Sequence, residues 1–189
     1  MKVMKFGGTS VGKPERMHDV AALVTRDEDA KIVVLSALSG TTNTLVEIGS
    51  ALANGEKASA KEHIDKLNAH YQNFISNLLS TQEAQDKCRA IIAEHFEFLN
   101  IILKISFNEA LNKDILAQGE LMSTKMFSCY LEEKGIDHLL LPALDFMTID
   151  SYEEPQIGSI KVKLSQILNQ HKDKKIFINN FKTGFDKEI

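Results

Sequence analysis

The sequence lacks tryptophan and has only two cysteines and three prolines among its 189 residues. The cysteines, Cys88 and Cys129, are far apart in helical patterns, so we expect reduced thiols in a core rather than a disulfide framework. No apolar run is long enough to span a bilayer, and the first residues lack the apolar segment of a signal peptide. These absences predict a cytoplasmic protein.

An excess of positive charge is also missing, since the formal net charge is −4. No basic stripe is present that would neutralise a phosphate backbone, which argues against nucleic-acid binding. The histidines show no zinc-ligand spacing. Asp145 and Asp150 are the only acids that suggest a metal pair, but acids near strand ends are usually solvated or capping. We therefore expect no metal site built from side chains.

Short apolar runs predict a parallel sheet. Residues 31–37 are continuously apolar, as in a strand that is buried on both faces. A helical pattern that begins at Pro14 separates this run from a first strand at residues 2–6, and strand, helix and strand at this spacing indicate a βαβ unit. Further strands are expected at residues 138–141, 146–149 and 175–178.

The middle of the sequence carries no strand signal. Three Ser-x-x-Glu capping boxes precede apolar-periodic runs: Ser59 with Glu62, Ser80 with Glu83, and Ser106 with Glu109. Further helices are expected over residues 120–133 and 157–170. The sequence thus predicts a single α/β domain over residues 1–189, a three-layer αβα sandwich with a mainly parallel sheet and a helical insertion at about 59–117.

The first predicted strand runs into a glycine-rich turn that starts at Lys5 and reads Lys-Phe-Gly-Gly-Thr-Ser-Val-Gly-Lys. The turn satisfies the P-loop pattern, but Pro14 supplies no hydroxyl for Mg²⁺ and pushes Lys13 out of the helical conformation. We therefore reject a P-loop. Gly7 and Gly8 instead let backbone N–H groups approach phosphate oxygens, with the charge of Lys5 beside them. The ordinary alternative is a tight turn with a surface lysine.

Three segments in this order resemble the motifs of aspartokinases, which are members of the amino-acid kinase family. They are residues 5–11 (Lys-Phe-Gly-Gly-Thr-Ser-Val), residues 35–43 (Leu-Ser-Ala-Leu-Ser-Gly-Thr-Thr-Asn) and residues 119–124 (Gly-Glu-Leu-Met-Ser-Thr). The start and the uninterrupted middle look closest to the monofunctional, lysine-pathway type. The resemblance fades after residue 178, where the family's Arg-Gly-Gly-Ser-Asp-Tyr motif has no counterpart. It therefore implies the N-terminal part of a catalytic domain, incomplete at its C-terminus.

The resemblance implies a kinase that uses ATP, with Mg²⁺, to convert L-aspartate to 4-phospho-L-aspartate, the first step towards lysine, threonine and methionine. It implies that Lys5 is catalytic and contacts the ATP phosphates. The implied phosphate cradle also contains Gly7, Gly8, Thr9 and Ser10. Ser36, Thr42 and Glu120 are implied to bind the substrate, Thr42 at a carboxylate and Glu120 at the α-ammonium. Full-length members are commonly homodimers or larger.

Each implied role has a structural alternative. Thr41 or Thr42 could cap the helix that follows, and Ser36 could be a small residue at a strand end. Glu120 stands in an expected first helical turn, where the helix dipole favours an acid. The agreement of three ordered motifs favours the functional interpretation. Two other functions stay open: another amino-acid kinase, such as a glutamate or acetylglutamate kinase, and a catalytically incomplete fragment that binds aspartate or a partner subunit without turnover.

Overall fold

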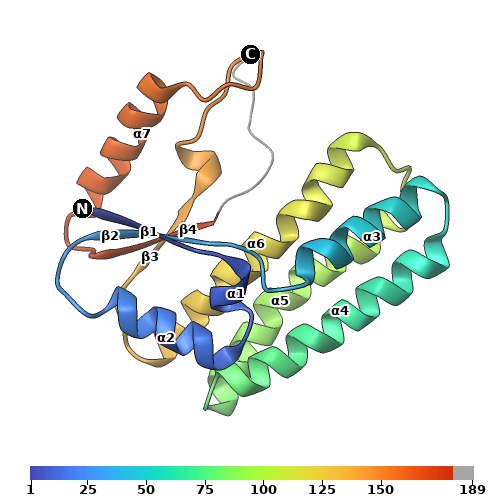
Figure 1. Cartoon of the computed structure of the whole chain (residues 1–189), viewed down its shortest axis with the longest axis horizontal. Helices are drawn as coiled ribbons and strands as arrows, with labels where there is room; N and C mark the ends of the chain where they lie inside the picture. Colours follow the sequence, from blue (N-terminus) through green and yellow to red (C-terminus); the bar gives the residue numbers. More distant parts are fainter. Residues whose placement is uncertain (181–189) are drawn as a thin grey trace.

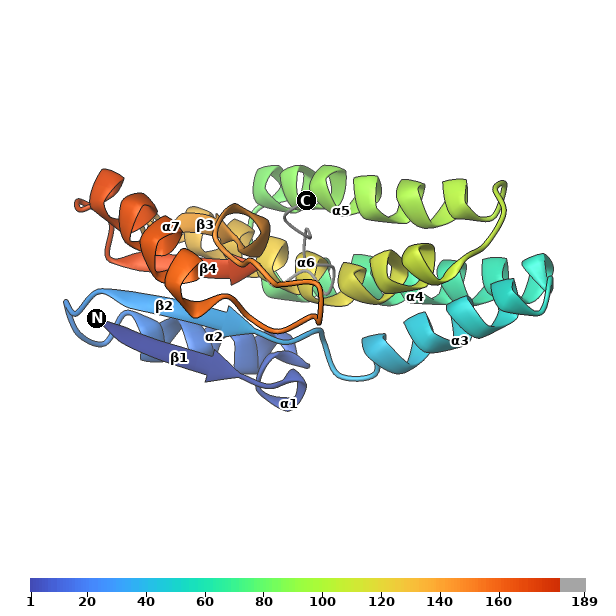
Figure 2. The ribbon, with the colours of Figure 1, turned by 90° about the horizontal axis from the view of Figure 1, so that it is seen from above.

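The computed structural model describes residues 1–180, in which helices cover both faces of a four-stranded sheet (Figures 1 and 2). The strands are β1 (Lys2–Phe6), β2 (Lys31–Leu35), β3 (Leu139–Pro142) and β4 (Ile176–Asn180), and a short helix, α1 (Gly8–Val11), follows β1. The strand order is β1-β2-β4-β3 and every pair is parallel. All strands therefore end at one edge of the sheet, where open α/β sheets bind their ligands.

Alternate residues of the inner strands pack against opposite layers. Ile32 and Phe177 lie in a core cluster with α7 (Ile157–Gln170), whereas Val33 belongs to the cluster that contains α2 (Pro14–Val24). Figure 1 shows α7 on one side of the sheet and α2 on the other. The apolar side chains of β2 thus pack against helices on both faces of the sheet. The predicted three-layer parallel fold is confirmed.

Four helices lie between β2 and β3 in the sequence, and they extend beyond the carboxyl edge of the sheet (Figure 2). They are α3 (Thr41–Ala53), α4 (Lys57–Leu78), α5 (Gln82–Ile102) and α6 (Glu109–Glu133). Their apolar faces join the same core cluster as α2, so these helices share a core with one face of the sheet. The predicted insertion at 59–117 is confirmed and corresponds to α4, α5 and the first part of α6.

All three predicted capping boxes are wrong. α4 begins at Lys57, so Ser59 already lies inside the helix. α5 and α6 are capped by Thr81 and Asn108, whose side chains accept hydrogen bonds from N–H groups of the first helical turn. In both helices a polar residue one or two positions after the predicted serine takes the capping role, because the chain is still extended there.

Two further element predictions are wrong. α6 is one continuous helix of 25 residues, so Glu120 lies near its middle and not in a first turn. Residues 146–149 do not form a strand of the sheet. The chain turns through a 3₁₀ helix at Ala143–Asp145, and the N–H of Met147 donates to the carbonyl of Ala143 (2.7 Å). This hydrogen bond closes a helical turn that takes the apolar run out of the sheet.

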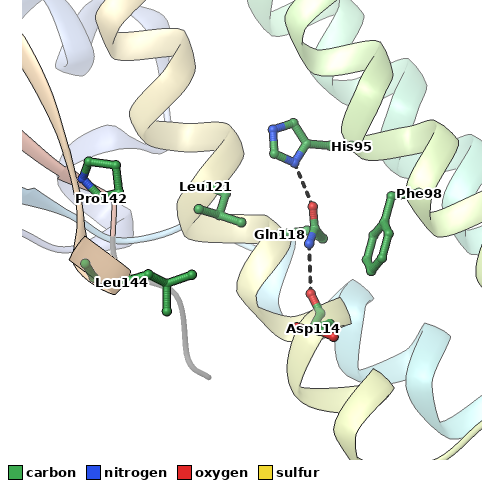
Figure 3. Close-up of a pocket in the computed structure, with 8 residues that line it drawn as sticks. His95, Phe98, Asp114, Gln118, Leu121, Pro142 and Leu144 are labelled. Carbon is green, nitrogen blue, oxygen red and sulfur yellow. Dashed lines mark hydrogen bonds between the residues drawn. The ribbon is translucent and has the colours of Figure 1, made fainter. Parts of the chain in front are cut away.

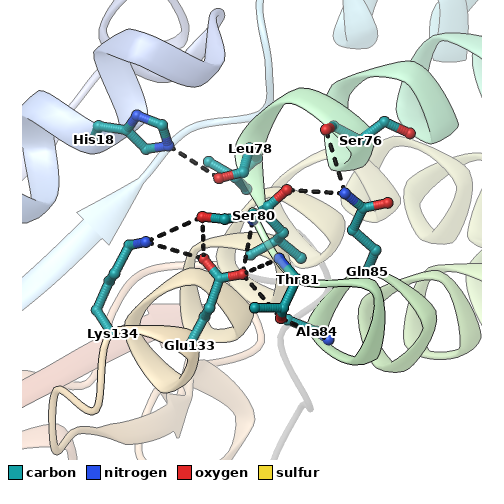
Figure 4. Close-up of polar contacts among 10 residues, drawn as sticks. His18, Ser76, Leu78, Ser80, Thr81, Ala84, Gln85, Glu133 and Lys134 are labelled. Atoms are coloured by element: carbon teal, nitrogen blue, oxygen red, sulfur yellow. Dashed lines mark hydrogen bonds and ion pairs between the residues drawn. The ribbon is translucent and has the colours of Figure 1, made fainter.

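Glu133, near the end of α6, fixes the turn between α4 and α5 (Figure 4). Its carboxylate accepts hydrogen bonds from the backbone N–H groups of Ser80 (2.7 Å) and Thr81 (2.8 Å), and from both hydroxyls (3.2 Å each). Burial alone would raise the pKa of Glu133, but the N–H groups of Thr81 and Ser80 and the ion pair with Lys134 lower it to about 2. Glu133 thus accepts the hydrogen bond from the Ser80 N–H that the predicted capping box assigns to Glu83.

We expect Glu133→Ala to lower the melting temperature by about 4–8 °C, because two N–H groups at the start of α5 lose their acceptor. Since folding lowers this pKa from 4.5 to about 2, the stabilisation is present above pH 4.5 and is lost as the pH falls towards 2. Thermal unfolding followed by circular dichroism at neutral and acid pH measures both effects. Glu132→Ala, which removes an exposed carboxylate paired with Lys87, is the control. An equal loss in that variant would contradict the role of Glu133.

Candidate functional site

The loops after β1 and β2 lie against each other at the carboxyl edge of the sheet. The N–H of Ser36 donates to the carbonyl of Phe6 (3.0 Å), which continues the pairing beyond the two strands. A Cβ atom at Gly8 would lie only 2.9 Å from the carbonyl oxygen of Ala37. Glycine is therefore required at this approach, and two of the three motif segments form one surface.

The middle of α6 brings the third motif to the same surface. A Cβ atom at Gly119 would lie 2.7 Å from the Cβ of Ala37 and 3.3 Å from the Cγ2 of Thr41. The helix and the loop after β2 touch because Gly119 has no side chain. The next residue, Glu120, faces the backbone N–H of Ala37 with its carboxylate. All three motif segments of the sequence analysis thus meet at one place.

Gly119→Ala is expected to destabilise the protein although it lies inside a helix. Alanine would normally gain about 1 kcal/mol over glycine, but overpacking against Ala37 costs about 1–3 kcal/mol. Ala37→Gly in the same chain should restore stability, since it removes the methyl group that clashes. Gly158→Ala in α7 is the matched control, because its Cβ would meet nothing within 4 Å. Urea unfolding measures these differences, and a stabilised Gly119→Ala variant would refute the close contact.

Among residues 1–180, the carboxylate of Glu120 has no cationic partner. Burial raises its pKa, and the N–H groups of Glu120 itself and of Ala37 offset this only in part. Within residues 1–180 no lysine, arginine or histidine forms an ion pair with it. Its place near the middle of α6 removes the helix dipole as an explanation for an acid here. A half-buried carboxylate in this environment is suited to binding a cation such as an ammonium group.

Lys5 lies at the end of the edge strand β1, and its exposed side chain forms no ion pair with the described residues. The two glycines that follow differ in their surroundings. A Cβ at Gly7 would meet nothing within 4 Å, so the backbone here is open to an approaching group, whereas Gly8 is closed by packing. Thr9 is exposed and Ser10 is half-buried in α1. Lysine and an open glycine backbone side by side are suited to an anion.

Lys13 does not have the backbone conformation of a P-loop lysine. Its backbone is extended, with φ −138° and ψ 147°, and Pro14 occupies the first turn of α2. The expected effect of the proline on Lys13 is confirmed.

The two neighbouring threonines at the start of α3 have different environments. Neither caps the helix, whose N-cap is Gly40 at φ 85° without a side-chain hydrogen bond. Thr41 is 1% exposed and its hydroxyl lies 3.2 Å from that of Tyr71, whereas Thr42 is exposed beside the loop that holds Ser36. The sequence alone gives Thr41 and Tyr71 no role at the site. Tyr71 has the periodicity of an ordinary core residue, and the burial of the two threonines can be told apart only when the orientation of α3 is known.

A cavity of about 380 Å³ lies between α5, α6 and the end of β3 (Figure 3). The Nδ1 of His95 donates to the side-chain oxygen of Gln118 (2.6 Å), and its Nε2 has no partner among the described residues. Burial lowers the pKa of His95, so the ring stays neutral at pH 7. The lining includes Leu121 of the third motif, but none of the sequence-predicted site residues.

In residues 1–180 no group of three or more His, Cys, Asp or Glu side chains is placed to hold a metal ion. Asp150, one of the two acids that suggest a metal pair in the sequence, accepts hydrogen bonds from the N–H groups of Tyr152 (2.8 Å) and Glu154 (3.0 Å). The described helices include none with the length and apolar character of a membrane span.

The sequence profile of the amino acid kinase family matches residues 1–188. Aspartokinase 2, chloroplastic, of Arabidopsis thaliana is 35% identical over 164 residues, which cover 82% of this chain and 29% of that protein. Lysine-sensitive aspartokinase 3 of Escherichia coli K12 is 32% identical over 137 residues, which cover 71% of this chain and 29% of that protein. The crystal structure of E. coli aspartokinase III in complex with lysine and aspartate matches with a TM-score of 0.78 at 26% identity, over 95% of this chain and 40% of that one. The chain thus spans less than half the length of these relatives.

Proposed function

Because this chain belongs to the amino acid kinase family, we propose that it binds L-aspartate and takes part in transferring the γ-phosphoryl group of ATP to it. The product is 4-phospho-L-aspartate, the first intermediate towards lysine, threonine and methionine. The observation that carries this proposal is the half-buried carboxylate of Glu120, which has no cationic partner within residues 1–180 and lies where the three motif segments meet. The relatives support the choice of amino acid, since they are aspartokinases and one structure holds aspartate.

Glu120 would bind the α-ammonium of the substrate. Burial disfavours the ionised form of this carboxylate, and an ion pair with a substrate ammonium would stabilise that form. Thr42 offers a hydroxyl and a position in the first turn of α3, where free N–H groups favour an anion such as a substrate carboxylate. Ser36 directly follows β2 and precedes Ala37, which packs against Gly119 of α6. A cation site and an anion site on adjoining motif segments would suit an amino acid with an acidic side chain.

Lys5 would bind the phosphates of ATP and stabilise the charge of the transferred group. The open backbone at Gly7 lets a phosphate approach, and Gly8 holds the loop against Ala37. Thr9 and Ser10 would complete the cradle at the start of α1. Mg²⁺ would arrive with the nucleotide, whose phosphate oxygens it prefers.

The proposed reaction needs positioning more than proton transfer. The attacking oxygen belongs to a carboxylate that is already ionised at pH 7, so the site needs no general base. The main obstacle is the repulsion between this carboxylate and the phosphates. A lysine and backbone N–H groups that face the transferred group lower this barrier, while Glu120 holds the other end of the substrate away from the phosphates.

Trapping the acyl phosphate with hydroxylamine tests the proposal on this chain. We expect hydroxamate that depends on both ATP and L-aspartate. Product from L-glutamate or N-acetyl-L-glutamate in place of L-aspartate would indicate a different amino-acid kinase. L-Aspartate binding without hydroxamate would assign the amino-acid site, but not turnover, to this chain alone. If the chain neither forms hydroxamate nor binds L-aspartate, the proposal is wrong.

A further inference from the structure

A buried pair of hydroxyl groups joins α3 to α4 next to the candidate site. The Oγ1 of Thr41 lies 3.2 Å from the phenolic oxygen of Tyr71, and the two residues are 1% and 0% exposed. Burial raises the pKa of Tyr71, so its hydroxyl keeps its proton and bonds to Thr41 as a neutral group. Because solvent does not reach either group, loss of one partner would leave the other without a hydrogen bond.

This pair is connected to the substrate-binding groups on two sides. A Cβ at Gly119 would lie 3.3 Å from the Cγ2 of Thr41, so Thr41 packs on the backbone of α6 at the residue before Glu120. Thr41 also precedes Thr42 in the first turn of α3. After burial and the hydrogen bond to Thr41, the charge of Glu120 is a further influence on the pKa of Tyr71, which places the phenol within electrostatic range of this carboxylate.

We propose that Tyr71 is a positioning residue for the amino-acid substrate. Through its hydrogen bond to Thr41 it sets the separation between Glu120 and Thr42, which bind the two ends of aspartate. The inference rests on the function proposed above and gives α4 a part in it, although α4 carries none of the residues expected to touch the substrate. A role in packing alone would not require the hydroxyl groups, since phenylalanine and valine have nearly the same shapes.

The test compares Tyr71→Phe, Thr41→Val and the double variant by calorimetric titration with L-aspartate and with succinate, which lacks the ammonium group. Each single variant is expected to bind L-aspartate about tenfold more weakly and to lose part of its preference over succinate. Affinity for ATP should not change. The double variant should be no weaker than either single variant, because both remove the same hydrogen bond.

Ser128→Ala is the matched control. It removes a buried hydroxyl of α6 that hydrogen-bonds to His138 (2.7 Å) away from the site, and should leave L-aspartate affinity unchanged. Unchanged affinity and preference in the folded single variants would overturn the inference and leave the proposed function intact. If Tyr71→Phe does not fold, Thr41→Val decides alone. Absence of L-aspartate binding to the unmodified chain would overturn the proposed function, and the inference with it.

Discussion

Lys5→Ala is expected to lower the rate of acyl-phosphate formation by about a hundred- to a thousandfold, the loss typical when one group that stabilises a transition state is removed. The side chain is exposed and has no ion pair among the described residues, so the substitution should not destabilise the fold. Affinity for ATP should fall as well, whereas affinity for L-aspartate should stay the same, because Glu120 and Thr42 are untouched. Hydroxylamine trapping and calorimetric titration measure these quantities.

Lys2→Ala provides the control for removing a lysine from β1. Lys2 lies at the opposite end of the strand and pairs with Asp27 (3.0 Å) and Asp29 (2.6 Å), away from the motif segments. Its loss should leave the rate unchanged. An active Lys5→Ala variant, or equal losses in both variants, would show that the charge at Lys5 is not the group that acts on the phosphates.

Glu120→Gln is expected to weaken L-aspartate binding by about 30-fold or more, because the ammonium group of the ligand loses its half-buried, negatively charged partner. Succinate should bind no more weakly than to the unmodified chain, because it has no ammonium group for Glu120 to hold. The unmodified chain should also lose L-aspartate affinity as the pH falls through the raised pKa of Glu120, because protonation removes the charge that the ammonium needs. The glutamine variant should lack this pH dependence.

Glu132→Gln on the same helix is the control for Glu120→Gln. Its carboxylate is exposed and pairs with Lys87 at the far end of α6, so the substitution should not change L-aspartate affinity. A Glu120→Gln variant that binds L-aspartate as tightly as the unmodified chain would mean that another group holds the ammonium.

The sheet was predictable because its signal is local. An apolar run such as residues 31–37 indicates a buried parallel strand without knowledge of its neighbours. The approach of the first two motif segments to each other was predictable for a related reason, since both follow strands of a parallel sheet and such strands end at one edge. The structure adds the contact of Gly119 with Ala37, which requires the path of α6 through space.

The helix boundaries were not predictable from local capping signals. The turn before α5 is stabilised by Glu133, a residue more than fifty positions away in the sequence, and no window around Ser80 contains this information. The sequence predicts a helix that begins at residue 120, but α6 continues through Gly119, whose missing side chain allows it to pass close to the loop after β2. That continuity moves Glu120 from a helix start, where the helix dipole favours an acid, to the helix interior, where the dipole does not explain one.

The roles of Thr41 and Tyr71 were beyond sequence reasoning for a different reason. Two adjacent threonines have the same chemistry, and only the phase of α3 decides that Thr41 is buried and Thr42 exposed. Tyr71 fits the apolar period of α4, and the pattern carries no sign of the hydroxyl's partner thirty residues away.

Calorimetric titration of the unmodified chain with L-aspartate and succinate tests the central claim most directly, because the two ligands share their carboxylates and differ at the ammonium. The account predicts that L-aspartate binds at least about tenfold more tightly, owing to its charge-assisted contact with Glu120. Equal affinities, or no binding of L-aspartate, would contradict an amino-acid site at the junction of the three motif segments.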